Sequence, residues 1–185
     1  MELKRYIKQL SDKIVHVYYS TEEGSSYKSY LIAKDFSAQQ YDEQIYLEEI
    51  EGIKFLYKGA CVLKQEKASL YKKDVYKYVI DGEPVIKKKL TANGEVSYIE
   101  NARQEQERTS YEGQLTFQVG KDELLLGLGQ YEDGVFDYRN RTEYLYESNM
   151  RIAIPFLITT GHYAIFIDSE SNMIFNSNNE KVTFT

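Results

Sequence analysis

Hydrophobic and polar residues alternate or cluster in short runs along most of the chain, and this pattern predicts strands. The runs are rich in β-branched and aromatic residues, which favour extended structure. They fall at 14–19, 44–49, 53–63, 69–80, 84–90, 95–99, 114–119, 123–126, 152–159, 162–168 and 182–184. Near the start, the spacing of Leu3, Tyr6, Ile7 and Leu10 fits one short amphipathic helix, with a strand as the alternative.

Turn residues separate these runs at the spacing of an antiparallel β-sandwich. Asp81-Gly82 and Asn93-Gly94 predict hairpin turns, because both central residues of a type I′ turn need a positive φ and these pairs tolerate it. The most polar stretch, 100–112, is interpreted as an exposed connection. Many short strands, few helices and two prolines therefore predict an all-β chain, with residues 1–185 forming a single β-sandwich domain.

Length and charge narrow the classes of function. The 185 residues suffice for one domain, but not for a sandwich followed by a (β/α)8 barrel of roughly 250 residues. Lys and Arg total 23 against 29 Asp and Glu, a net charge of −6. This balance argues against nucleic acid or an anionic membrane as a partner, because both need a basic surface.

Two residue types add detail. The 18 tyrosines favour half-buried strands, and exposed tyrosines could alternatively stack on sugar rings. Cys61 is the single cysteine, so the chain has no internal disulfide and fits a reducing compartment; we expect this side chain to be buried. With no signal-peptide pattern and no membrane-spanning run, the expected location is cytoplasmic.

Catalytic motifs are not evident in the chain. His16 and His162 lie far apart in strand-like runs without the spacing of metal ligands. No Gly-x-Ser-x-Gly elbow occurs, so we predict no catalytic residue, no metal site and no cofactor. Gly127 and Gly129 follow an apolar run, which predicts a β-bulge or a close backbone approach.

Three segments nevertheless resemble glycoside hydrolase family 31. Residues 125–134 (LLGLGQYEDG) resemble the family's glycine-leucine-glycine segment. Residues 149–157 (NMRIAIPFL) resemble its asparagine followed by an apolar-Pro-Phe strand, and 161–168 (GHYAIFID) resemble the strand after that. The order and spacing of all three segments match, although His162 and Ala164 replace two of the family's glycines.

The resemblance implies a galactose-mutarotase-like sandwich that packs against a catalytic barrel. In the family, two barrel aspartates cleave α-glycosidic bonds with retention, and neither aspartate motif occurs here. The chain also ends at 182–185 as if inside a strand. We therefore interpret it as the N-terminal, non-catalytic domain of an α-glucosidase or α-xylosidase, truncated before the barrel and inactive alone. An exposed barrel-docking surface would then favour self-association.

The resemblance also points to a loop that reaches the sugar subsites of the full enzyme. The candidate substrate-binding residues in this loop are Asp137, Arg139, Asn140, Arg141 and Thr142. Some family members carry Asn-Arg-Asp in the loop; Asn140 and Arg141 match the first two positions, and Thr142 replaces the aspartate. The bound partner would be an α-linked oligosaccharide. The alternative is a solvated loop whose charges pair with each other.

Two other functions are compatible with the sequence. The chain could be a free-standing carbohydrate-binding or mutarotase-like module that recognises sugar through tyrosines. Mutarotase chemistry needs a histidine and a carboxylate on one face, and two scattered histidines do not favour it. The second alternative is an all-β interaction domain without any sugar ligand.

Overall fold

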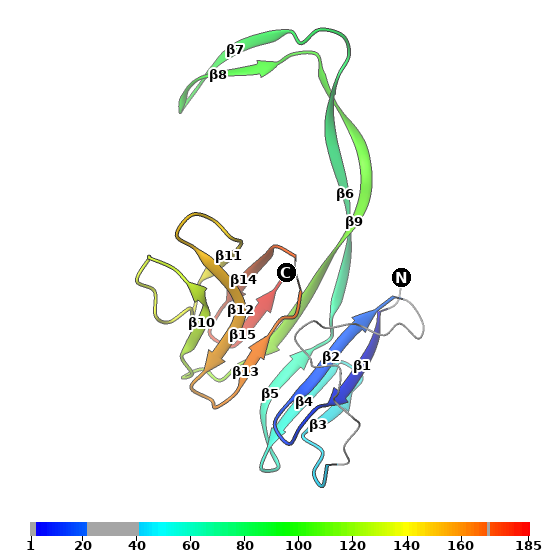
Figure 1. Ribbon diagram of the computed structural model, residues 1–185, viewed down its shortest axis with the longest axis vertical. Helices are drawn as coiled ribbons and strands as arrows, with labels where there is room; N and C mark the ends of the chain where they lie inside the picture. Colours follow the sequence, from blue (N-terminus) through cyan, green and yellow to red (C-terminus); the bar gives the residue numbers. More distant parts are fainter. Residues whose placement is uncertain (1–2, 22–40, 170) are drawn as a thin grey trace. The chain divides into compact units, whose positions relative to one another are not determined.

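All regular structure among the residues that the computed structural model describes is β-strand (Figure 1). The structure describes residues 3–21, 41–169 and 171–185. The strand pairs with a described register are antiparallel, so the predicted all-β, antiparallel class is confirmed. The strands are β1 Lys4–Gln9, β2 Val15–Ser20, β3 Tyr46–Glu49, β4 Gly52–Tyr57, β5 Ala60–Glu66, β6 Ser69–Ile80, β7 Ile86–Thr91, β8 Gly94–Ile99, β9 Ala102–Gln118, β10 Leu125–Gln130, β11 Thr142–Leu145, β12 Ile152–Thr159, β13 Ala164–Phe166, β14 Met173–Ser177 and β15 Lys181–Phe184.

The N-terminal segment is a strand, so the short amphipathic helix is wrong and the strand alternative is confirmed. β1 pairs with β2 along its whole length, with Tyr6 opposite Tyr18 and their rings stacked at 4.7 Å between centroids. Apolar residues at three- and four-residue intervals fit either structure, so a pairing partner decides between them. The β1–β2 hairpin also contacts β5, because Gln65 Nε2 donates a 2.6 Å hydrogen bond to the Tyr19 hydroxyl.

Two sheets pack face to face in the first of two compact units, which comprises residues 1–69 and 113–185. The larger sheet has the order β11-β14-β15-β9-β5-β4-β3, with β6 paired to β9 off this path, and the smaller has the order β10-β12-β13. One apolar cluster joins both sheets, as expected for a β-sandwich. Its buried members are Leu63, Phe117, Val119, Leu125, Leu128, Tyr138, Leu145, Leu157, Ile165, Met173, Phe175, Val182 and Phe184.

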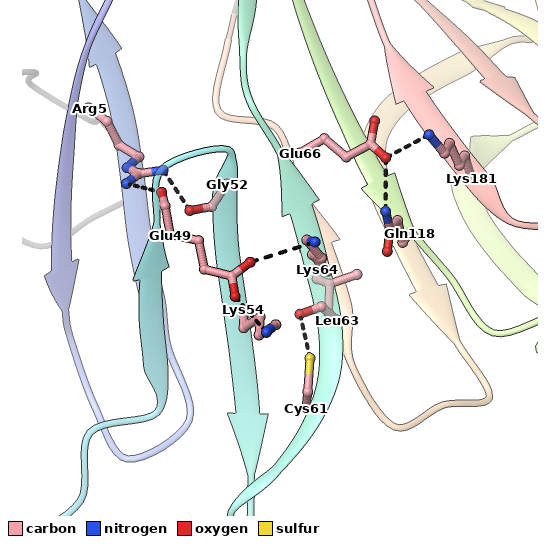
Figure 2. A network of polar contacts seen from close by, with 10 residues as sticks. All are labelled: Arg5, Glu49, Gly52, Lys54, Cys61, Leu63, Lys64, Glu66, Gln118 and Lys181. Carbon is pink, nitrogen blue, oxygen red and sulfur yellow. Dashed lines mark hydrogen bonds and ion pairs between the residues drawn. The ribbon is translucent and has the colours of Figure 1, made fainter.

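Polar side chains bridge neighbouring strands on the solvent side of the larger sheet (Figure 2). Glu49 carboxylate oxygens lie 2.5 Å from Lys54 Nζ and 3.6 Å from Lys64 Nζ. Glu66 accepts a 2.9 Å hydrogen bond from Gln118 and lies 2.6 Å from Lys181 Nζ. Solvent screens such exposed pairs and they contribute little to stability, so burial in the core dominates it.

The expectation that Cys61 is buried is wrong. Cys61 is exposed, and its thiol lies 3.6 Å from the carbonyl oxygen of Leu63 (Figure 2). The turn Lys58-Gly59 has positive φ at both residues and connects β4 to β5 within one predicted run. Cys61 therefore lies beside a hairpin turn, where the strand register shifts at Leu56, and not in the middle of one long strand.

The second compact unit, residues 70–112, contains most of β6 and β9 together with the β7–β8 hairpin. We call this unit the arm. Its polar stretch 100–112, expected to be a connection, belongs largely to β9. In the arm, β9 pairs with β6. β15 pairs with β9 only from residue 115 onward. A two-stranded ribbon has both faces in solvent, so no apolar alternation marks this strand in the sequence.

The two predicted hairpin turns of the arm have different outcomes. Asp81-Gly82 does not close a hairpin, because β6 pairs with β9 and not with β7. Asn93-Gly94 lies at the β7–β8 hairpin as expected, with Thr91 opposite Gly94. Gly94 has φ 108° but Asn93 is not among the residues with positive φ, so the turn is not type I′.

The glycine segment of β10 forms the predicted bulge. The register with β12 shifts between Gly127, opposite Leu157, and Gly129, opposite Ala153. Gly129 has φ 119°, and a Cβ there would lie 2.0 Å from the carbonyl oxygen of Ile152. A side chain would therefore force β10 and β12 apart.

Gly129→Ala is expected to lower the free energy of unfolding by about 2–4 kcal/mol, because it adds both a clash and an unfavourable φ. Urea denaturation followed by circular dichroism measures this change. Gly113→Ala is the matched control, since Gly113 has no positive φ and a Cβ there meets no atom within 4 Å. That variant should stay within about 1 kcal/mol of wild type, and equal losses in the two variants would contradict the close approach.

Candidate functional site

The five candidate substrate residues lie in and just after the connection from β10 to β11. Arg139 is the centre of this connection. Its guanidinium donates hydrogen bonds to the carbonyl oxygens of Gly120 (2.9 Å), Glu123 (3.0 Å), Asn178 (3.4 Å) and Asn179 (3.0 Å). These acceptors belong to the β9–β10 and β14–β15 connections, so one side chain ties three loops together.

Asp137 also bonds to the backbone of its own surroundings. Its Oδ1 accepts hydrogen bonds from the amides of Leu125 (3.0 Å) and Arg139 (3.1 Å). Between them, Tyr138 is 3% exposed, its amide donates to the Leu125 carbonyl, and its carbonyl accepts from the Ser177 hydroxyl. Asp137 and Arg139 therefore shape the loop from inside.

Asn140, Arg141 and Thr142 are exposed. Asn140 adopts φ 56° and its side-chain amide donates to the side-chain oxygen of Asn179 at 3.0 Å. Thr142 Oγ1 accepts a 2.7 Å hydrogen bond from Asn176. The Arg141 backbone is bonded to Ser177, whereas its guanidinium makes no hydrogen bond or ion pair with any residue that the structure describes.

A shallow hollow of roughly 270 Å³ lies beside this loop. Its lining combines the bulged segment of β10 with the first half of the β10–β11 connection, and the Phe136 ring at its edge is 71% exposed. The hollow is open, and polar and apolar surface line it in similar measure. Its lining residues are Leu126, Gly127, Gly129, Gln130, Tyr131, Val135, Phe136 and Tyr138.

Arg151 connects the hollow to the start of β12. Its guanidinium carbon lies 4.5 Å from the Tyr131 ring centroid and 5.7 Å from that of Tyr146, and its Nη2 lies 3.2 Å from Glu143. Tyr131 donates a 2.8 Å hydrogen bond to the Leu128 carbonyl, and burial raises its pKa to about 12. Sequence reasoning missed this cluster, because its members come from separate segments that only folding brings together.

The outer face of the smaller sheet is apolar. Along β12, Leu157 and Thr159 point into the core, whereas alternate residues on the opposite side are 37–51% exposed. Phe156 meets Phe166 of β13 edge to face, with 5.9 Å between ring centroids. We define the outer face by these exposed side chains: Ile152, Ile154, Phe156, Ile158 and Phe166.

The histidines do not converge with other ligands. His16 stacks against Tyr18 in the β1–β2 hairpin, and burial lowers its pKa while Asp168 opposes this. His162 lies in the turn between β12 and β13 with φ 66°. Within the described ranges no group of three His, Cys, Asp or Glu residues is placed to hold a metal ion. In the same ranges no helix is long and apolar enough to cross a membrane.

The fold is similar to part of a glycoside hydrolase. Two solved structures of the GH31 dextranase FjDex31A from Flavobacterium johnsoniae match, one a mutant complexed with isomaltotriose and one complexed with glucose. Each match covers 98% of this chain with a TM-score of 0.53 and 13% sequence identity. The chain spans 22% of the length of either dextranase chain. No family model matches the sequence.

Alanine variants of Arg139 and Arg141 distinguish a guanidinium that supports the loop from one that is only exposed to solvent. Arg139→Ala removes the donors to four carbonyl groups and should lower the free energy of unfolding by about 2–3 kcal/mol. Arg141→Ala is the neighbouring control and should change it by less than about 0.5 kcal/mol, because this guanidinium is exposed. Thermal and urea unfolding measure both stabilities, and similar stability of the two variants would show that the hydrogen bonds of Arg139 do not hold the three loops together.

Proposed function

We propose that this chain is a non-catalytic β-sandwich domain of a glycoside hydrolase that acts on α-linked oligosaccharides. In this proposal it corresponds to the N-terminal, galactose-mutarotase-like domain of an α-glucosidase or α-xylosidase. It packs against the catalytic barrel and has no turnover of its own. The observation that carries the proposal is the outer face of the smaller sheet, together with the similarity of fold to part of a much longer GH31 enzyme.

The outer face has the character of a domain interface. β12 is apolar on both sides, a pattern typical of strands that are covered on both faces. Its inner side is covered by the larger sheet, and its outer side exposes Ile154 and Phe156 together with Phe166 of the adjacent strand. Contiguous apolar patches are unusual on monomers and commonly mark interaction sites. A catalytic domain on this face would bury them.

The loop supplies the sugar contacts in this proposal. Arg139 and Asp137 are already bonded to backbone groups, so they hold the loop in shape. Arg141, Asn140 and Thr142 project from it with exposed donors and acceptors, which suit the hydroxyl groups of a sugar. Phe136 adds an exposed ring on which a sugar could stack.

The isolated chain should not hydrolyse aryl α-glucosides, aryl α-xylosides or isomaltotriose, because both carboxylates of the reaction would belong to the barrel. Release of p-nitrophenol or glucose measures this. Turnover above the buffer rate that copurifies with the chain over successive columns would contradict a non-catalytic role.

The double variant Ile154→Ser with Phe156→Ser tests whether the outer face is a docking surface. We expect it to lower binding of a hydrophobic-surface dye such as ANS, because two of the five outer-face side chains become polar while the exposed side chains of the arm are unchanged. It should also weaken binding to a catalytic barrel of the proposed enzyme class supplied as a separate polypeptide, measured by calorimetry.

Ile50→Ser is the control for this experiment, since Ile50 is 92% exposed and lies in the β3–β4 turn. It should leave dye and barrel binding unchanged. Equal dye signals from the wild type, the double variant and this control would show that the outer face is not an accessible apolar surface.

A further inference from the structure

The arm has no core of its own. No residue of 70–112 is buried, although the segment forms long strands. Ordering the backbone costs roughly 1–2 kcal/mol per residue, and an isolated hairpin in water is marginal at best. Large apolar side chains are instead exposed all along it: Tyr71, Tyr76, Tyr78, Ile80, Val85, Ile86, Leu90, Val96, Tyr98, Ile99 and Tyr111.

The register of the β7–β8 hairpin shows which of these side chains share a face. Ile86 lies opposite Ile99 and Leu90 opposite Glu95, and alternate residues of a strand lie on the same side. Ile86, Lys88 and Leu90 of β7 and Glu95, Ser97 and Ile99 of β8 therefore form one surface, the tip face. Leu90 is 85% exposed and Ile86 68% exposed. Lys88 lies between them along β7, and its Nζ is 2.9 Å from the carboxylate of Glu95 on β8.

Charge distinguishes the arm from the remainder of the chain. The arm contains eight Lys and Arg and eight Asp and Glu, whereas the remaining residues contain 15 and 21 and thus carry the whole net charge of −6. Two copies of the chain repel each other through the first unit but not through the arm. The tip face is also self-complementary, because it presents both a cation and an anion between apolar residues.

We propose that the tip face is a self-association surface that binds the same face of a second copy about a two-fold axis. Ile86, Leu90 and Ile99 of each copy become buried between the two hairpins. Around the axis, Lys88 of one copy meets Glu95 of the other and the reverse, since residues of an isologous interface contact each other reciprocally. The inference goes beyond the proposed hydrolase role and does not depend on it.

Sedimentation velocity of the full chain, from about 1 to 200 µM, tests the association. We expect a concentration-dependent dimer, and Ile86→Ser with Leu90→Ser should raise its dissociation constant by about tenfold or more. Both residues are exposed, so the unfolding midpoint of the sandwich should not change. Ile50→Ser controls for the loss of an exposed aliphatic side chain, and Ile154→Ser with Phe156→Ser controls for association through the outer face.

A charge exchange tests the reciprocal contact. Lys88→Glu alone and Glu95→Lys alone should each be monomeric, because like charges then meet across the axis. An equimolar mixture of the two variants should form a heterodimer within about threefold of the wild-type affinity, since both intermolecular pairs have opposite charges again. Within each hairpin, residues 88 and 95 still carry like charges in the mixture. If the Lys88–Glu95 pair acted only within one hairpin, mixing the variants would therefore not restore the dimer.

Three results would overturn the proposal. One is a wild-type chain that stays monomeric at the highest concentration. Another is a dimer that persists in the Ile86→Ser and Leu90→Ser variant. The third is a mixture of the two charge variants that remains monomeric. Loss of the dimer only in the outer-face variant would likewise assign association to the smaller sheet and not to the arm.

Discussion

The aromatic packing on the core side of the larger sheet is the interaction on which the rest of the sandwich depends. The Phe175 ring meets those of Tyr138 and Phe184 edge to face, with centroids 6.4 and 5.3 Å apart, and Phe184 in turn meets Phe117. Tyr138 belongs to the β10–β11 connection and the phenylalanines to the larger sheet. The burial that joins the sheets therefore also anchors the candidate loop, and the polar bonds of Asp137 and Arg139 orient a segment that is already held.

The strands that face a core on one side could be predicted well. Runs 152–159 and 182–184 fall on β12 and β15, because β-branched and aromatic residues are dense there. β14 was missed since a polar residue occupies one of its inward positions: Ser177 is buried and bonds to the Tyr138 carbonyl. The polar half of β9 was missed for the opposite reason, because it has no inward position at all.

The candidate site divides along similar lines. Sequence identified a loop crowded with polar groups, but could not tell which groups the fold would use for itself. Asp137 and Arg139 bond to backbone up to 40 residues away, and such partners cannot be read from local spacing. Arg141 follows Arg139 by two positions and has the same side chain, but it is exposed. Whether the exposed residues contact a sugar stays a prediction.

The long strand β9 has a consequence for how the molecule unfolds. Its last residues include Phe117, 5% exposed in the sandwich core, whereas its first residues lie in the arm, where no side chain is buried. Local opening free energies follow buried contacts, so the two halves of one continuous strand belong to different cooperative units. Amides near residue 117 open only when the sandwich opens, and those near 105 open in small local fluctuations. The arm can therefore fray, or change in length and sequence, without disturbing the sandwich core.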